Sequence, residues 1–191
     1  MSEKLYHHLN KFVAIDRTDF PEIFSYFNFE SITKKEIIMH AGAKCTSTYF
    51  VLTGCLHMYF LDPKGTEQTI QFGIENWWIT DALSFHYQNN TEFSIRAVEN
   101  SEILRLDYSK QHELFEKFPE IENYFRHIYQ IAYGASIMRI KYIFDYSKEE
   151  IFYRFRAQFP DFVNRVPQYL IASYLGLTPE YLSQIRSKSI S

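Results

Sequence analysis

The stretch from residue 168 to residue 187 constrains the fold most, because its apolar residues are spaced as in two short helices joined by a tight turn. Counted from Gln168, apolar side chains stand fourth, eighth, tenth, fifteenth and eighteenth, at Ile171, Leu175, Leu177, Leu182 and Ile185. The small Ala172 stands where two crossing helices approach closely. Gly176 stands where the turn requires a positive φ angle. This pattern predicts a helix-turn-helix.

The residues after the turn support the same prediction. Thr178 can cap the second helix, and the first turn of a helix tolerates Pro179. The alternative is a plain helical hairpin, which does not require spacing, turn residue and cap together. A helix-turn-helix predicts contact with double-stranded DNA.

Charge is divided unevenly along a chain whose formal net charge is −3. Residues 138–191 hold eight Lys and Arg against five Asp and Glu, whereas residues 1–137 hold 12 against 18. An acidic body with a mildly basic tail fits DNA contact that is confined to the C-terminal part.

The composition favours a globular protein of the cytoplasm. The chain has 191 residues, of which 46% are apolar, enough for one large domain or two small ones. No apolar run approaches the ~20 residues of a membrane span, and the N-terminus lacks a signal peptide, so we expect no membrane contact. Cys45 and Cys55 are expected to be reduced thiols, with a redox pair as the alternative.

Short β-branched and aromatic runs, separated by turn residues, fill the region between Phe29 and Asp107. The expected strands are 36–40, 48–53, 55–61, 66–72, 93–98 and 102–106. Regular short strands of this kind indicate an antiparallel β-roll or jelly roll.

Helical periodicity appears on both sides of these strands, in residues 1–28 and from Tyr108 onward. The longest helix is expected over 119–145 and is apolar on more than one face, so it needs two packing partners. Its own sandwich can cover one face and the same helix of a second copy the other; the alternative is burial within one chain. A shorter helix is expected over 147–158.

The predicted fold class is therefore α+β: an N-terminal antiparallel β-roll with flanking helices, a long dimerisation helix and a C-terminal helix-turn-helix. The corresponding segments are 1–118, a sensor domain with the N-terminal helices; 119–146, the dimerisation helix; and 147–191, the DNA-binding domain.

This order of elements resembles the Crp/Fnr family of bacterial transcription regulators, and more narrowly the short members common in Bacteroidetes. The residues that carry the resemblance are Tyr49–Leu56 in the β-roll, Trp77–Asp81, and the Ile171–Arg186 motif. The family implies a homodimer that binds a two-fold-symmetric operator, a small-molecule effector in the β-roll, and contact with RNA polymerase in activators.

The residues that match the family's cyclic-nucleotide site depart from its pattern. Where the family reads Gly-Glu-Leu and then Arg-Ser or Arg-Thr, this chain has Thr80-Asp81-Ala82-Leu83 and then Thr91-Glu92. Asp81 can keep the carboxylate role, but Thr91 replaces the phosphate-binding Arg and Glu92 adds a negative charge. We therefore expect no tight cyclic-AMP binding, and the pocket is either open to another ligand or filled by its own aromatic side chains. The candidate effector-pocket residues are Trp78, Thr80, Asp81, Ala82, Thr91 and Glu92.

The second helix of the motif is expected to enter the major groove with its N-terminal end. Glu180 can accept a hydrogen bond from a cytosine amino group, or act only as a charge that favours the helix dipole. Gln184 can pair with adenine. The full set of candidate DNA-binding residues is Gln168, Tyr169, Thr178, Pro179, Glu180, Ser183, Gln184, Arg186 and Lys188.

Other functional classes have less support. A jelly-roll metalloenzyme needs clustered His and Glu ligands, but His57 and His86 are isolated and no His-x-His occurs. No Gly-rich phosphate loop or nucleophile elbow is present, so we expect neither catalysis nor a cofactor or metal. The alternatives left open are a ligand-sensing or scaffold dimer that has lost DNA binding, and a haem sensor of the same family.

Overall fold

The structure is a computed structural model and describes residues 2–188. Contacts between residues divide the chain into two compact units. The first unit combines the residues up to 60 with residues 71–130, and the second combines residues 61–70 with those from 131 onward.

Eight strands of the described chain form two open four-stranded sheets, in the orders β1-β8-β3-β6 and β2-β7-β4-β5. Strand β8 pairs antiparallel with both β1 and β3, and β7 pairs antiparallel with both β2 and β4. The strands are β1 Asn28–Ile32, β2 Ile37–Met39, β3 Ser47–Thr53, β4 Leu56–Leu61, β5 Glu67–Gly73, β6 Trp78–Ile79, β7 Ser94–Ala97 and β8 Ser101–Asp107.

Helices precede the sheets, lie between β6 and β7, and make up the whole C-terminal part of the described chain. They are α1 Ser2–Leu9, α2 Phe20–Ser25, α3 Ala82–Tyr87, α4 Tyr108–Lys117, α5 Pro119–Asp145, α6 Lys148–Gln158, α7 Pro160–Arg165, α8 Gln168–Tyr174 and α9 Pro179–Lys188.

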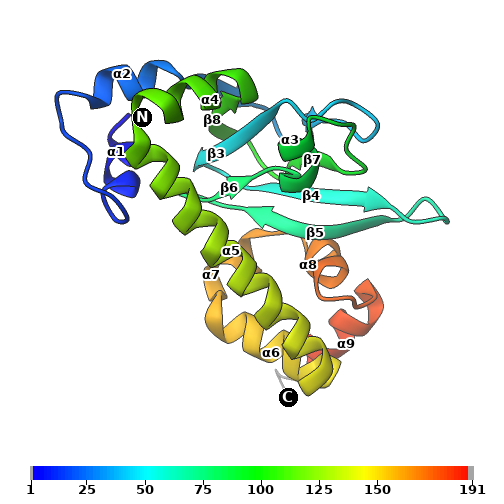
Figure 1. Ribbon diagram of the computed structural model, residues 1–191. Coiled ribbons are helices and arrows are strands. Elements are labelled where there is room, and N and C mark those ends of the chain that lie inside the picture. Colours follow the sequence, from blue (N-terminus) through cyan, green and yellow to red (C-terminus); the bar gives the residue numbers. More distant parts are fainter. Residues whose placement is uncertain (1, 189–191) are drawn as a thin grey trace. The chain divides into compact units, whose positions relative to one another are not determined.

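The main hydrophobic core lies between the first sheet and the helices that cover it. Helix α4 lies against β8 (Figure 1), and α1, α2 and the start of α5 contribute to the same core. Its buried residues are Leu5, Leu9, Ile15, Phe20, Ile23, Phe27, Phe50, Leu52, Leu104, Leu106, Leu114, Phe118, Ile121, Tyr124 and Phe125. Burial of this apolar surface is the main force that holds helices and sheet together.

Three polar groups inside this core satisfy one another. The indole N–H of Trp78 donates to the hydroxyl oxygen of Tyr124 over 2.6 Å, and that hydroxyl lies 2.7 Å from Nδ1 of His8. Burial, with a smaller contribution from the charge of Lys11, lowers the pKa of His8 to about 4. His8 is therefore neutral near pH 7, and its Nδ1 accepts the Tyr124 proton.

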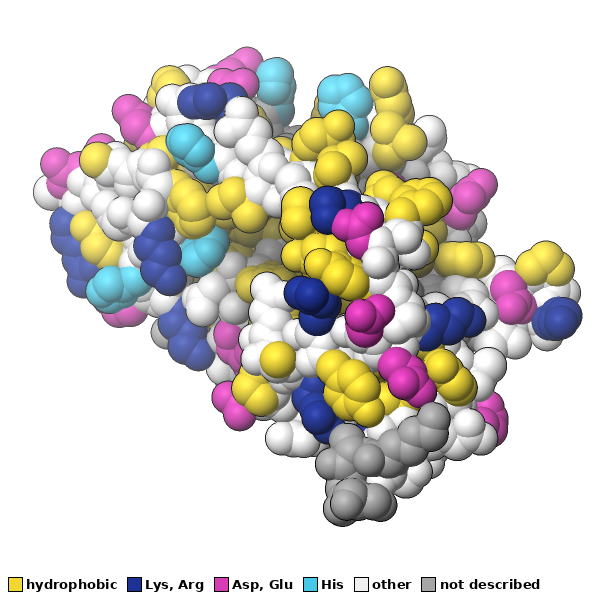
Figure 2. Space-filling view, turned by 90° about the horizontal axis from the view of Figure 1, so that it is seen from below, with side chains coloured by type: hydrophobic (Ala, Val, Ile, Leu, Met, Phe, Trp, Pro, Cys, Tyr) yellow, Lys and Arg dark blue, Asp and Glu magenta, His cyan; other side chains and the backbone are white. Residues whose placement is uncertain are grey.

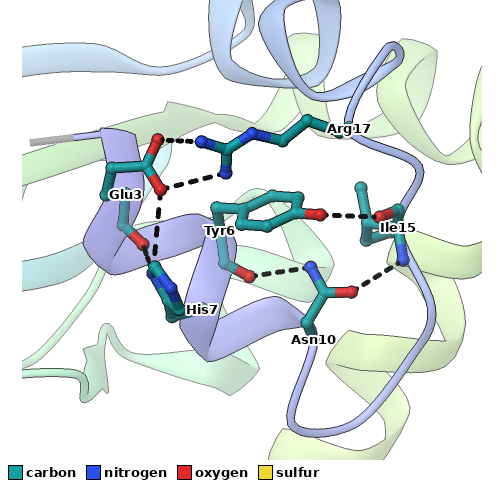
Figure 3. A network of polar contacts seen from close by, with 6 residues as sticks. All are labelled: Glu3, Tyr6, His7, Asn10, Ile15 and Arg17. Atoms are coloured by element: carbon teal, nitrogen blue, oxygen red, sulfur yellow. Dashed lines mark hydrogen bonds and ion pairs between the residues drawn. The ribbon is translucent and has the colours of Figure 1, made fainter.

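A second polar network fastens the loop after α1 (Figure 3). Arg17 forms two hydrogen bonds with the carboxylate of Glu3, of 2.9 and 2.6 Å, and its guanidinium lies 4.4 Å from the ring centroid of Tyr6. Asn10 accepts from the backbone N–H of Ile15 over 3.1 Å, and the Tyr6 hydroxyl donates to the carbonyl of the same residue. The Arg17–Glu3 pair is exposed, so we expect it to order the loop more than to stabilise the fold.

The second unit contains the tip of the β4–β5 hairpin and the helices from the second half of α5 onward. Ser147 and Glu150 form a capping box at the start of α6, which the sequence places before an apolar run. Phe152 of α6, Val163 of α7 and Val166 are buried.

Most elements lie where the sequence predicts them, and the α+β fold class with antiparallel sheets and a long helix is confirmed. The expected helix over 119–145 is α5. Strand β1, the two-residue β6 and the short α3 are not among the elements expected from the sequence. In the described part of the chain, no helix has the length and apolar character that spanning a membrane requires.

His8 makes the stability of the protein depend on pH. Because its pKa lies below the usual value of 6.5 in the folded chain, its contribution to stability is complete above pH 6.5 and is lost as the pH falls toward 4. In urea titrations, we expect the free energy of unfolding of the wild type to fall by up to about 1.4 kcal/mol for each pH unit in this window, relative to that of His8→Gln. The control is His7→Gln, which changes an exposed histidine of the same helix. Parallel pH profiles for wild type and His8→Gln would contradict the assignment.

Candidate nucleic-acid interface

Helices α8 and α9 are joined by a turn at the place where the sequence predicts a helix-turn-helix. Gly176 lies in the turn with φ of +68°, and a Cβ at this position would meet no atom within 4 Å, so the backbone conformation and not space favours glycine. The apolar residues that face the interior are buried, namely Leu170, Ile171, Ala172, Leu177, Leu182 and Ile185. Leu175 is only half-buried, in contrast to its place in the expected core.

The second helix starts as the sequence predicts. The Thr178 hydroxyl accepts a hydrogen bond from the backbone N–H of Tyr181 over 3.2 Å, which is an N-cap contact. Pro179, Glu180, Ser183 and Gln184 are exposed around the N-terminal half of α9. This half presents side chains that could reach base edges.

The remaining candidate DNA contacts differ in availability. Tyr169 is 53% exposed on α8, whereas Gln168 is half-buried and donates through Nε2 to the carbonyl of Val163 over 2.9 Å. Arg186 is half-buried, and the side chain of Lys188 lies outside the described residues. Tyr169 is therefore better placed than Gln168 for contact with a DNA backbone.

The positive charge of this unit is partly engaged with aromatic rings. Arg154 lies 4.0 Å from the ring centroid of Tyr146, and Arg156 lies 5.2 Å from that of Tyr153. On the face drawn in Figure 2, basic and acidic side chains are scattered around hydrophobic ones and do not form one continuous basic band. Electrostatic attraction to phosphates is therefore modest on that face.

Two residues of the effector site predicted in the β-roll form a hydrogen bond with each other. The hydroxyl of Thr91 donates to Oδ2 of Asp81 over 2.7 Å, and the other carboxylate oxygen accepts from the backbone N–H of Ser84 over 3.1 Å. Asp81 thereby caps α3, and both Asp81 and Thr91 are buried. Burial would raise the pKa of Asp81, but the hydrogen bonds from Ser84 and Thr91 outweigh it and lower the pKa below its usual value.

The other predicted pocket residues differ in burial and in contacts. Thr80 is buried and donates to the carbonyl of Ser47 over 2.9 Å. Ala82 and Glu92 are exposed, so the charge of Glu92 is screened by water and does not lie in a partly buried site as expected. Trp78 packs in the helix-covered core, with ring centroids 4.7 Å from Phe125 and 5.2 Å from Phe50.

Two contacts around the helix-turn-helix were not predicted from the sequence. The hydroxyl of Ser173 bonds to the backbone of β5, and Arg139 reaches backbone carbonyls of both β5 and α8. No local pattern signals them, because they join segments separated by 35 to 106 residues. Among the described residues, no three His, Cys, Asp or Glu side chains cluster as metal ligands would.

Comparisons with known proteins agree with this architecture. Residues 29–118 match the family model of the cyclic nucleotide-binding domain. No curated protein matches the sequence significantly. Among solved structures, the c-di-GMP responsive global regulator CLP of Xanthomonas campestris is 13% identical, with a TM-score of 0.69 over 91% of each chain.

Two further solved structures have the same fold. A CooA mutant from Carboxydothermus hydrogenoformans is 18% identical, with a TM-score of 0.68 over 87% of this chain and 78% of that one. The Thermus thermophilus catabolite activator protein is 16% identical, with a TM-score of 0.59 over 92% of this chain and 84% of that one. The chain thus contains a region similar to cyclic nucleotide-binding domains and shares its fold with Crp/Fnr-type regulators.

Proposed function

We propose that this protein is a homodimeric, sequence-specific DNA-binding transcription regulator of the Crp/Fnr type that does not respond to cyclic AMP. The observation that carries the proposal is the exposed N-terminal half of α9, presented by a turn with Gly176 at φ of +68° and an N-cap at Thr178. The same proposal implies action on chromosomal DNA in the cytoplasm, without catalysis, and contact with RNA polymerase if the protein is an activator.

The exposed half of α5 supports dimerisation. Residues Ile121, Tyr124 and Phe125 are buried, but large apolar side chains are exposed further along the same helix. Tyr133, Ile137, Ile140 and Phe144 are 70%, 46%, 52% and 85% exposed and follow one another at alternating spacings of four and three residues. This is the spacing of a coiled-coil seam, so a second copy of α5 is the partner that fits it.

The internal Asp81–Thr91 bond supports independence from cyclic AMP. A cyclic nucleotide phosphate needs a cation and free backbone donors. Here Thr91 stands where the family has Arg, and both its hydroxyl and the Ser84 N–H are used by the buried carboxylate of Asp81. One neighbour of the same fold is described as responsive to c-di-GMP, so the fold itself is compatible with other effectors.

Selection of binding sites from random duplex DNA tests the function. We expect the purified, ligand-free protein to enrich a palindrome with half-sites about one helical turn apart, more strongly at low salt. Gln184→Ala should relax the preference at one base pair per half-site, by about 1–3 kcal/mol. Failure to enrich any site, with or without a cell metabolite extract, would favour the sensor or scaffold dimer that has lost DNA binding.

Light scattering tests the dimer. We expect a dimer at micromolar concentration for the wild type and a shift toward monomer for Ile137→Asp, because a charge in an apolar seam loses its hydration on association. Ser109→Asp is the control, since it adds the same charge at an exposed position of α4. A wild-type monomer, or an Ile137→Asp dimer of unchanged stability, would reject this interface.

Thermal melting with cyclic AMP tests whether the site around Asp81 and Thr91 excludes the nucleotide. Ligand at 100 times its dissociation constant stabilises a protein by about 2.7 kcal/mol. Since we expect the protein not to bind cyclic AMP, millimolar cyclic AMP should leave the melting temperature unchanged. A rise of several degrees would show that the Asp81–Thr91 bond opens to admit the nucleotide.

A further inference from the structure

The hydroxyl of Ser173, on the last turn of α8, forms two hydrogen bonds with the edge of a sheet. It accepts from the backbone N–H of Thr69 over 2.8 Å and donates to the carbonyl of Glu67 over 3.1 Å. Strand β5, which carries both backbone groups, is the last strand in the order of its sheet. The edge of a sheet presents backbone donors and acceptors that need partners, and one serine supplies both here.

The guanidinium of Arg139 joins the same two segments from α5. Its Nη1 donates to the carbonyl of Ile70 and its Nη2 to the carbonyl of Tyr174, each over 2.6 Å. The group also lies 4.1 Å from the ring centroid of Tyr174. The carbonyl of Tyr174 belongs to the C-terminal turn of α8, where carbonyls lack helical partners and a positive charge is favoured.

These four hydrogen bonds form what we call the clasp: Ser173 and Arg139 with the backbone of Glu67, Thr69, Ile70 and Tyr174. All of these residues belong to the second unit. The clasp has a specific geometry, because the planar guanidinium directs its N–H groups at two separate carbonyls while it stacks on a ring. Its partners on the hairpin are backbone groups, so its geometry depends on the position of β5 and not on side chains there.

The clasp leaves the base-reading side of the motif free. Ser173 and Tyr174 end the first helix, whereas Glu180, Ser183 and Gln184 are exposed on α9. The clasp holds α8 and does not cover α9. Because the two helices pack as a pair, holding α8 restricts the direction in which α9 points. Such a contact can act on recognition without touching DNA.

We propose that Ser173 and Arg139 are positioning residues for DNA recognition, which clasp the helix-turn-helix to the β4–β5 hairpin and so fix the direction of α9. This inference rests on the proposed function. In a dimer, two copies of α9 must meet two half-sites at one spacing, so the clasp contributes to binding of the whole palindrome. A single half-site can be bound by one helix-turn-helix in any orientation, so its affinity does not depend on the clasp.

The test compares Ser173→Ala and Arg139→Gln with the wild type on three duplexes: the selected palindrome, one isolated half-site, and palindromes with the central spacer changed by one or two base pairs. A tenfold loss of affinity corresponds to about 1.4 kcal/mol, which is within the net contribution of one or two hydrogen bonds. We expect a loss of about tenfold on the palindrome and unchanged half-site binding. We also expect weaker discrimination against altered spacers, since a helix-turn-helix without these hydrogen bonds can reorient.

Two control variants separate positioning from folding. Ser173→Thr keeps the hydroxyl and should keep most of the palindrome affinity and the spacer discrimination. Ser25→Ala removes a hydroxyl that donates to the Glu22 carbonyl within α2 of the first unit, and it should leave DNA binding unchanged. Melting curves of all variants show whether the chain remains folded.

Several results would overturn the inference. Equal losses on half-site and palindrome would mean that Ser173 and Arg139 only stabilise the motif. Unchanged affinity would mean that the clasp has no role in DNA binding. Tighter DNA binding by the variants would mean that the clasp holds α9 in a direction that disfavours binding. If the wild type binds none of the duplexes, the proposed function fails and the positioning role fails with it.

Discussion

The buried hydroxyl of Tyr124 is the contact on which the arrangement of the first unit depends. It receives the Trp78 indole N–H from a strand of the first sheet and bonds to His8 of the first helix, so one atom joins three segments distant in the sequence. An unsatisfied polar group in this core would cost about 1–3 kcal/mol, so the three side chains must stay together or the core must open. Because Tyr124 lies on α5, this contact fixes the start of the helix whose far half is exposed and apolar.

The Asp81–Thr91 pair shows how a buried carboxylate can be satisfied by neighbouring groups of the same chain. A phosphate-binding arginine requires its anion, because a buried guanidinium left unpaired is costly. A threonine has no such requirement, and Thr91 satisfies its hydroxyl with Asp81. The carboxylate in turn caps α3 through Ser84, so the cap and the bond to Thr91 depend on the same group.

Sequence patterns predicted the fold wherever a local rule decides structure. The spacing around Gly176, the Thr178 cap and the apolar repeat of α5 depend on residues within a few turns of one another, and the structure has all three. The two-residue β6 was missed because so short a strand has no periodicity, and its residues belong to the core through Trp78. The clasp was missed because a serine bonding to a distant backbone leaves no pattern. The exposure of Glu92 was missed for a similar reason, since burial of a loop residue is decided by the whole fold.

Under the proposed function, the low positive charge of the C-terminal unit would make the orientation of α9 important. A reader rich in Lys and Arg gains affinity from counterion release at any orientation, since phosphates line the whole duplex. Here several arginines stack on rings, and the exposed end of α9 is polar but carries the acidic Glu180. Such a reader depends more on correctly placed hydrogen bonds to bases, which weaken steeply with misalignment. In the proposed dimer, restricting the direction of α9 through α5 and through the backbone contacts of α8 would lower the entropy that must be lost on binding. Rigid placement of the reader can thus compensate for charge that it lacks.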